Sequence, residues 1–466
     1  MSFRRSSFAW CASALLLSIS QSHLPQTASA QGFISSSTSR PFVTGLEPVV
    51  GRRGQVVGGI LVNSKGLLKR ATNGSISQLR RMRQKHLRTN PVPTAIAQKS
   101  KLRKISLRKL EEQIVRLRKK NLPLTEEIKY LAGLQSIQYV FIVPKQHDVV
   151  IAGYAEGWKV SKSGHLVGAT TGRPVMNLDD LIIALRTAAA ATQGRGISCS
   201  IDPTAEGIQR FTKLAARLRG SGKSVANRIA RAVGKQQVTV TGVPRTSHFA
   251  RVLVAADYRM KCLAMALEKS PVRQLPSYLA MLQSSNQQPK NLMPRWWMEP
   301  RYTSIRHDNE RLTWELNGGS IQVLSQLDQA GAGGRQAGQV KEWADLMTRH
   351  YDDIAKHIPT FGKLRNCMDL AVVGALIAKE SVRQRVRNPF SVLFDKKNVK
   401  FTPWAVPSEI DSRASFVRRA GQTIVSVSGG VTVDSWKPLE KTSPKAQLAR
   451  VRQSLGWKAT PKFWWD

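Results

Sequence analysis

The feature that most limits the fold of this chain is a run of positive charge between Lys65 and Asn121. The run holds eighteen lysines and arginines but only two acids, Glu111 and Glu112. Like charges at this density repel one another when a chain compacts, so the run is more typical of an extended or partly helical arm than of a packed domain. We therefore expect a basic, partly disordered arm over residues 31–121.

The end of this arm has a helical pattern. In the sequence ISLRKLEEQIVRLRKKN, the residues Leu107, Leu110, Ile114 and Leu117 recur at spacings of three and four. Glu112 also precedes Arg116 by four residues, which supports a helix. The pattern predicts an amphipathic helix.

The arm is also the best candidate for binding a partner, since the formal net charge of the chain is +42. Clustered cations attract polyanions and release their counterions. Expected partners are acidic or sulfated polysaccharides, anionic lipids or DNA, although a merely solvated tail is the alternative. No aromatic residue interrupts the basic run, which argues against a base-stacking platform. The candidate polyanion-binding residues are Arg80, Arg81, Arg83, Lys85, Arg103, Lys104, Arg108, Arg116, Arg118, Lys119 and Lys120.

The first thirty residues resemble an export signal. Arg4 and Arg5 precede an apolar stretch from Phe8 to Ile19, and Ala28-Ser29-Ala30 follows. This order predicts a signal peptide cleaved after Ala30. The apolar stretch is shorter than the roughly 20 residues that span a bilayer, and no transmembrane segment is expected elsewhere. The predicted location is therefore the periplasm or the cell exterior.

The rest of the chain predicts an α+β fold. Strands and helices alternate over residues 122–283, including a helix from Leu178 to Ala191, which indicates a mixed α/β core. Residues 284–380 should form an antiparallel sheet, with Asn317-Gly318-Gly319 as a hairpin turn, and two helices that pack as a hairpin around Pro359. Residues 381–466 should form a basic extension with a small hairpin at 423–436.

One group of residues is a candidate for catalysis. Ser198, Cys199 and Asp202 lie where a predicted strand leads into a helix, a place where ligand-binding groups gather in alternating sheets. A nucleophilic cysteine needs a base, and His248 is the nearest plausible one. The alternative is that Cys199 is a buried small side chain and Asp202 caps the next helix. Convergence of these residues in one open pocket would favour an enzyme.

Other polar groups have simpler interpretations. His248 and Asp257 are nine residues apart on one predicted helix, too far to cooperate directly, so we expect Ser247 or Thr246 to cap the helix and Asp257 to pair with a basic neighbour. His350 and His357 are seven residues apart, not the four that favour a metal site, and no Cys-x-x-Cys pair exists. The sequence therefore indicates no metal and no cofactor.

Aromatic and glycine-rich segments remain open to two interpretations. Trp296, Trp297, Trp314 and Tyr302 either form a platform for sugar rings or fill the core. The glycines from Gly331 to Gly338 precede a helix but lack the ending of a phosphate-binding loop, which favours a linker. After the leader only Cys199, Cys262 and Cys367 remain, so at most one disulfide is possible.

Several strings carry a family resemblance: LPLTEEIKYLAGLQSIQYVF, ISCSIDPTAEGI, SHFARVLVAADYRMKCLAM, MPRWWMEPRY and LRNCMDLAVVGALI. Together they resemble an uncharacterised family of exported proteins from planctomycete bacteria, domain of unknown function 1598. The resemblance spans residues 122–434. It implies no activity and no site residues. We therefore expect a non-enzymatic envelope or extracellular binding protein, with an envelope-polymer hydrolase acting through Cys199, Asp202 and His248 as the alternative.

Overall fold

The structure is a computed structural model. It describes residues 43–44, 55–57, 60–62, 68–70, 73–191, 196–219, 223–285, 294–325, 338–395, 400–401, 403–404, 406–419, 422–425, 428–454 and 464–466. The expected leader over residues 1–30 and the glycine-rich loop before Gly338 lie outside these residues. Within them, no helix combines the length and the apolar character needed to cross a membrane.

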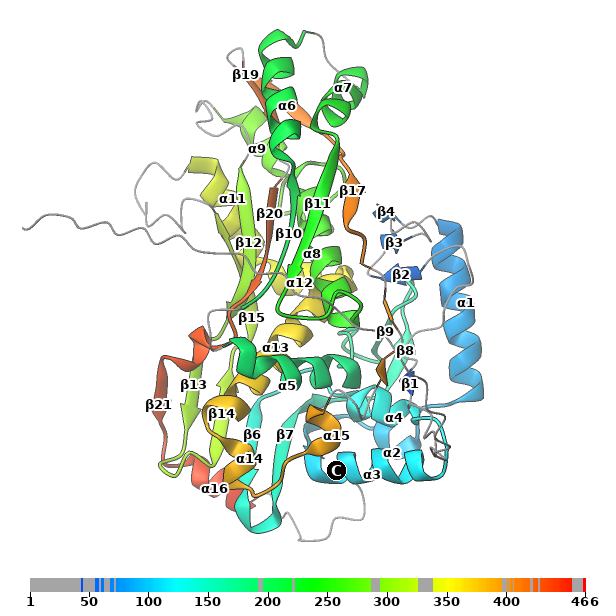
Figure 1. The fold of residues 1–466 in the computed structure, drawn as a ribbon, viewed down its shortest axis with the longest axis vertical. Coiled ribbons are helices and arrows are strands. Elements are labelled where there is room, and N and C mark those ends of the chain that lie inside the picture. Colours follow the sequence, from blue (N-terminus) through cyan, green and yellow to red (C-terminus); the bar gives the residue numbers. More distant parts are fainter. Residues whose placement is uncertain are drawn as a thin grey trace, which may run out of the picture. The chain divides into compact units, whose positions relative to one another are not determined.

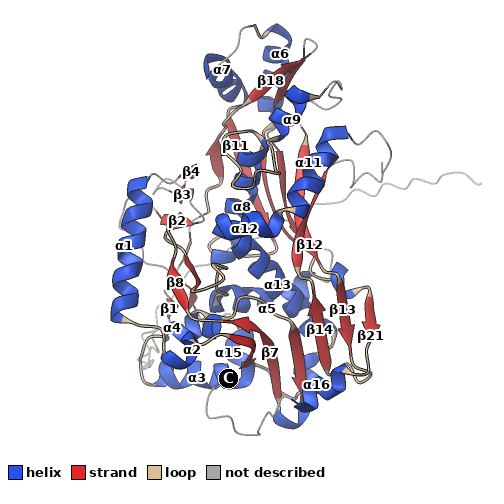
Figure 2. Ribbon diagram, turned by 180° about the vertical axis from the view of Figure 1, so that it is seen from behind, coloured by secondary structure: helices blue, strands red, loops and turns tan. Residues whose placement is uncertain are grey.

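Two six-stranded sheets organise the described chain (Figures 1 and 2). The first sheet has the order β21-β13-β14-β6-β7-β5, and the second has the order β15-β12-β20-β10-β11-β17. Neighbours pair antiparallel except for β13 with β21 and β12 with β20. The strands of the first sheet are β5 (Ser100–Ser106), β6 (Tyr139–Val143), β7 (Asp148–Ala155), β13 (Ser304–His307), β14 (Thr313–Asn317) and β21 (Thr442–Pro444). Those of the second are β10 (Ile197–Pro203), β11 (Lys235–Thr241), β12 (Arg295–Arg301), β15 (Ser320–Ser325), β17 (Glu409–Asp411) and β20 (Ser428–Val433).

The α+β class predicted from the sequence is confirmed, but its segments are interleaved. In the first sheet β14 pairs directly with β6, and in the second sheet β20 of the C-terminal extension joins β12 to β10. Residues 41–466 form one compact unit. The boundary expected near residue 284 therefore does not separate two bodies, because each segment supplies hydrogen-bonding partners to the other.

The turn expected at Asn317-Gly318-Gly319 is not the hairpin turn. β12 and β13 form one arm of a long antiparallel ribbon and β14 and β15 form the other, so that His307 pairs with Trp314 and Arg301 with Ser320. The ribbon reverses at Asp308, whose carboxylate accepts the backbone N–H of Leu312 at 2.7 Å. The glycines instead lie where the ribbon passes from one sheet to the other. Gly318 has φ +67°, a backbone conformation that favours glycine.

The hairpin expected over residues 423–436 does not form. β19 (Gln422–Val425) pairs with β18 (Phe416–Arg419), whereas β20 lies between β12 and β10 in the interior of the second sheet. Glycine permits this close approach, since a Cβ at Gly430 would lie 2.4 Å from the carbonyl oxygen of Cys199. The C-terminal extension therefore supplies an inner strand of the main fold.

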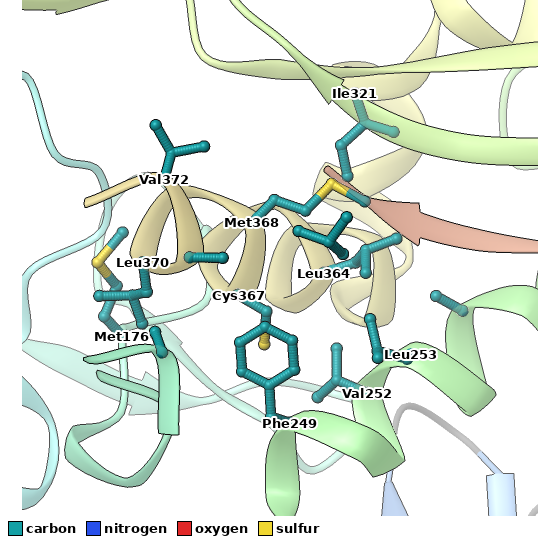
Figure 3. Close-up of a cluster of buried hydrophobic side chains, with 14 of the residues drawn as sticks. Met176, Phe249, Val252, Leu253, Ile321, Leu364, Cys367, Met368, Leu370 and Val372 are labelled. Atoms are coloured by element: carbon teal, nitrogen blue, oxygen red, sulfur yellow. The ribbon is translucent and has the colours of Figure 1, made fainter. Parts of the chain in front are cut away.

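Three helices form the centre of the core. α13 (Pro359–Lys379) packs on α5 (Leu178–Ala191) and on α8 (His248–Ala264), and α8 in turn covers β10 and β20. Every residue of α13 from Pro359 to Ile377 is buried. Figure 3 shows the α13 side chains Leu364 and Cys367 directed toward Phe249 and Val252 of α8. The bounds of α5 are those that the sequence predicts.

The remaining helices cover the sheets and link their strands. They are α1 (Asn73–Thr89), α2 (Thr94–Ala97), α3 (Leu107–Lys119), α4 (Glu126–Lys129), α6 (Ala205–Arg217), α7 (Lys223–Val233), α9 (Tyr278–Ser284), α11 (Gly338–Arg349), α12 (Tyr351–His357), α14 (Val382–Arg385), α15 (Ser391–Phe394) and α16 (Leu448–Ser454). Short strands outside the two main sheets are β1 (Val43–Thr44), β2 (Gln55–Val57), β3 (Ile60–Val62), β4 (Leu68–Arg70), β8 (Trp158–Val160), β9 (Leu166–Gly168) and β16 (Lys400–Phe401).

The described part of the basic segment is built into this fold. β5 pairs with β7, and the amphipathic helix predicted near residue 107 is confirmed as α3. Its four periodic apolar residues are buried, and the Ser106 hydroxyl caps it by accepting the N–H of Lys109 at 3.1 Å. Residues 73–119 are thus partly helical, as expected, but they contribute to the core because apolar side chains alternate with the charged ones.

Candidate functional site

A basic helical hairpin connects β10 to β11 and consists of α6 and α7 (Figure 1). Thr204 begins α6 by accepting the N–H of Gly207 at 3.0 Å. One face of each helix is apolar at helical spacing, with Phe211 on α6 and Val225 and Ile229 on α7. These side chains form a small hydrophobic cluster with Met265, separate from the main core. The hairpin is therefore held by its own apolar faces.

The outer faces of the same hairpin carry positive charge. Between residues 205 and 234 the only acid is Glu206. Six cations are exposed and form no hydrogen bond or ion pair through their side chains within the described chain. We call these the hairpin cations: Lys213, Arg217, Arg219, Lys223, Arg228 and Arg231. Sequence reasoning placed the polyanion-binding residues before Asn121 and missed this second group, although its charge run is visible in the sequence.

The outer face of α1 adds a further basic surface. Arg81, Lys85 and Arg88 follow one another at spacings of four and three, and all are exposed. Arg80 lies beside them and is exposed too. None of these four side chains has an ion-pair partner in the part of the chain that the structure describes. Arg116 and Lys119 on α3, and Lys120 directly after it, are exposed as well.

Two of the predicted polyanion-binding residues are inside the protein. Arg83 and Arg103 are each 3% exposed. Arg83 occupies the inner stripe of α1 with Leu79, four residues earlier, and donates to the carbonyl of Gly164. Arg103 donates to the carbonyl of Ala132 at 2.7 Å. Both side chains act as buried donors here, so neither contacts solvent.

The remaining members of that predicted set are partly engaged. Lys104 pairs with the carboxylate of Asp466, and Arg108 pairs with Glu112 one turn later on α3. Arg118 is half-buried. The exposed part of the predicted set is therefore on α1 and at the end of α3.

The candidate catalytic residues on β10 do not form a common site with His248. Ser198 hydrogen-bonds to the hydroxyl of Thr241 at 2.8 Å, and Asp202 pairs with Arg295 at 2.7 Å. Cys199 is 1% exposed, and burial raises the pKa of its thiol well above the usual value. β10 is antiparallel to β11 and β20, so its end is not the switch point of a parallel sheet. Thr204, not Asp202, caps the helix that follows.

His248 belongs instead to a buried polar group that we call the Asp180 cluster: Asn177 and Asp180 at the start of α5, His248 on α8, and Lys363 and Cys367 on α13. The Nδ1 of His248 lies 2.9 Å from Oδ2 of Asp180, and its Nε2 is buried with no hydrogen-bond partner among the described residues. Burial raises the pKa of the Cys367 thiol well above its usual value, and the Asp180 carboxylate raises it further. All these side chains are closed to solvent.

Burial sets the protonation of this cluster. Burial lowers the pKa of His248, although the nearby Asp180 carboxylate opposes the fall. Burial also lowers the pKa of Lys363 to about 7, with Arg83 adding to the fall and Asp180 opposing it. A carboxylate that holds one imidazole nitrogen is the arrangement used to orient a general base. Sequence reasoning found only His248, because its partners are far away along the chain. The one local signal for the cluster is Lys363, a lysine within a largely apolar helix.

The helix cap and the ion pair expected for α8 are confirmed. Ser247 caps α8 by accepting the N–H of Ala250, and Asp257 pairs with Lys261 at 3.0 Å. No cluster of three or more metal-ligating side chains occurs among the described residues. His350 precedes α12, and the ring of His357 contacts the carbonyl of Asp353.

The aromatic residues fill the core rather than form a platform. Trp296 is fully buried and packs on Trp343 with a ring separation of 4.7 Å, and Trp314 is 1% exposed. Tyr302 is partly buried and donates to Asp369. Trp297 is also half-buried, with the guanidinium of Arg295 over its ring. Cys199, Cys262 and Cys367 are buried free thiols.

A comparison with known protein families finds a match in the middle of the chain. Residues 199–278 match a family described as a protein of unknown function (DUF1598). The match supports the resemblance expected from the sequence, over a shorter stretch than residues 122–434, and includes the basic hairpin and α8. No curated protein and no solved structure matches the chain.

Proposed function

Because no activity can be taken from a relative, we propose from the geometry that this is a non-enzymatic binding protein for anionic polymers. The hairpin cations and the outer face of α1 are the proposed contact surfaces. The observation that carries the proposal is the group of six exposed cations on α6, α7 and the turn between them, with no partner within the described chain. Cations on a surface are compatible with folding without a partner, and they remain available to an external anion.

Charge, rather than base recognition, would give this surface its affinity. Phe211 is the only aromatic residue of the hairpin, and it is buried. A surface without exposed aromatic rings offers no platform on which bases stack. The proposed partners are therefore acidic or sulfated polysaccharides and anionic lipid surfaces. DNA is a further proposed partner, which the hairpin cations contact through its phosphates and not through its bases. The leader-like order of residues 1–30 supports an exported location, where such polymers form the cell envelope.

The binding experiment compares the protein with a variant in which all six hairpin cations are replaced by glutamine. Heparin and duplex DNA are the probes, and the association constant is measured over a salt series. Each cation that contacts DNA contributes about −0.9 to the slope of log K against log salt concentration. We expect weaker binding and a shallower slope for the variant.

A matched control separates a local surface from general charge. It replaces six exposed cations that are dispersed over the molecule and have no described partner: Lys145, Lys162, Lys269, Arg273, Arg387 and Lys441. The change in net charge is the same. The proposal predicts a clearly smaller loss for the control than for the hairpin variant, and an equal loss would argue against the hairpin as a site.

A further inference from the structure

A polar cavity of about 300 Å³ lies where the two sheets meet, away from the hairpin. The segment leading into β6 forms one wall, and the passage of the ribbon from β14 to β15 forms another. Residues from α12 and α13 complete it. The side chains used in the argument below are Gln138, Arg173, Glu315, Asp352, Arg365 and Asp369.

Glycine shapes this cavity. The ribbon bends at Gly318, and a Cβ at Gly319 would lie 3.0 Å from Oδ1 of Asp369. The backbone therefore approaches α13 closely, and no side chain at position 319 fills the space beside Asp369. Sequence reasoning treated these glycines only as a turn, so the cavity was not anticipated.

Each acid that lines the cavity already has a partner. Asp352 pairs with Arg365 at 2.8 Å, and the hydroxyl of Tyr302 donates to Asp369 at 2.6 Å. Glu315 pairs with Lys445 at 3.1 Å. The charges of Asp352 and Glu315 are thus paired within the protein, and the carboxylate of Asp369 is held by the neutral hydroxyl of Tyr302.

Arg173 differs from these acids. Its backbone N–H donates to Thr171 and its carbonyl accepts from Gly168, but its guanidinium forms no hydrogen bond or ion pair with any described residue. The group is half-buried beside a second arginine. Burial lowers the pKa of Arg173, and the positive charge of Arg365 lowers it further, while the nearby carboxylates of Asp352 and Asp369 oppose the fall. An oxyanion placed against Arg173 would satisfy its donors and relieve this repulsion.

We propose that this cavity binds a small polar molecule that carries an oxyanion group, with Arg173 as the residue that receives the anion. A volume of about 300 Å³ is at the small end of ligand pockets and suits one sugar-sized unit. Gln138, Ser136 and Asn317 supply amide and hydroxyl groups for its neutral part. The ligand class is an acidic or phosphorylated monosaccharide. This site uses none of the hairpin cations, so it stands or fails separately from the proposed polymer binding.

Titration calorimetry of the whole protein tests this site with three sugar probes, glucuronate, glucose 6-phosphate and neutral glucose, and with inorganic phosphate as a smaller anion. The principal variant is Arg173→Gln, and Arg273→Gln is the control, because Arg273 is an exposed arginine elsewhere. A second variant, Gln138→Trp, narrows the cavity without touching Arg173. Thermal unfolding confirms that each variant is folded.

The proposal predicts binding of one equivalent of glucuronate or glucose 6-phosphate and none of glucose. Arg173→Gln should weaken binding by about tenfold or more, Gln138→Trp should weaken it too, and Arg273→Gln should leave it unchanged. Whichever acidic sugar binds more tightly identifies the anion as a carboxylate or a phosphate. Absence of binding by both acidic sugars, equal binding of glucose, or a folded Arg173→Gln protein with unchanged affinity would overturn the assignment. If inorganic phosphate bound as tightly as both acidic sugars, the assignment of a monosaccharide as the ligand would be overturned.

Discussion

The α6–α7 hairpin and the Asp180 cluster use positive charge in opposite ways. On the hairpin, six cations face solvent and have no described partner, while an apolar face beneath them holds the helices together. In the Asp180 cluster, His248 and Lys363 are buried, and the same carboxylate interacts with both. Exposed charge costs little to fold, whereas a buried charge depends on its partner. The comparison indicates that the hairpin charges are available for binding and the cluster charges determine stability.

The largest expected effect comes from removing the shared carboxylate. Asp180→Ala leaves His248 and Lys363 buried without it, so the free energy of unfolding should fall by about 3–5 kcal/mol. Chemical denaturation at pH 7 measures the change. Asp353→Ala, on the exposed face of α12, is the matched control and should change stability by less than about 0.5 kcal/mol. A small effect of Asp180→Ala would show that the buried charges do not depend on this carboxylate.

A somewhat smaller effect is expected from the apolar face of the hairpin. Ile229 is fully buried in the small cluster, so Ile229→Ala should lower stability by about 2–3 kcal/mol, the lower part of the range for such truncations. Hydrogen exchange should show that the protection lost is concentrated in α6 and α7. If protection were lost equally throughout the protein, the hairpin would not be a separately held element.

The buried lysine should give the stability a pH dependence. Since the folded pKa of Lys363 is about 7 and its usual value is 10.5, the unfolded chain binds more protons between these two pH values. Below pH 7 the buried Lys363 is charged, and its burial lowers the free energy of unfolding by the full amount. This loss of stability becomes smaller as the pH rises from 7 toward 10.5. Lys363→Met removes this titration. Relative to the wild type, the variant should be most stabilised at pH 6 and should have lost a large part of this advantage by pH 9.

Urea denaturation at both pH values measures the difference between Lys363→Met and the wild type. Lys269→Met, an exposed lysine, serves as the control and should show a pH-independent difference. A difference for Lys363→Met that stays constant from pH 6 to pH 9 would contradict the lowered pKa.

The smallest effect on stability is expected from the hairpin cations themselves. Each replacement by glutamine removes an exposed side chain with no described partner, so each should change the free energy of unfolding by no more than about 0.5 kcal/mol. The melting temperature of the sixfold variant measures the total. A strongly destabilised variant would mean that these cations are part of the fold, and the contrast with the Asp180 cluster would disappear.

Local patterns in the sequence predicted many of the elements correctly. The spacing of Leu107, Leu110 and Ile114 predicts α3, and the residues from Leu178 to Ala191 predict α5. Both predictions succeed because the spacing of apolar residues along a helix is set by the helix itself and not by its distant neighbours. The same reasoning placed a turn at Gly318, where the glycine instead allows a bend between sheets. A left-handed backbone at glycine is common to both structures, so the residue type cannot distinguish them.

The Asp180 cluster and the burial of Arg83 and Arg103 depend on contacts between residues that are far apart in the sequence. Local sequence patterns carry no information about such contacts. His248 and Asp180 are 68 residues apart, and Arg83 and Gly164 are 81 apart. The charge run before Asn121 indicated a free arm, yet Arg83 and Arg103 are buried where carbonyl oxygens accept their N–H groups. Charge density alone did not reveal this, because the burial depends on which face of α1 and of β5 each arginine occupies.

The most direct test of the proposed function is the salt dependence of heparin and DNA binding by the wild type, the sixfold hairpin variant and the dispersed control. The account predicts that the hairpin variant binds more weakly with a distinctly shallower slope of log K against log salt concentration, and that the control keeps most of the wild-type slope. Equal slopes for the hairpin variant and the wild type, or equal losses in both variants, would contradict the assignment of α6 and α7 as the polymer-binding surface.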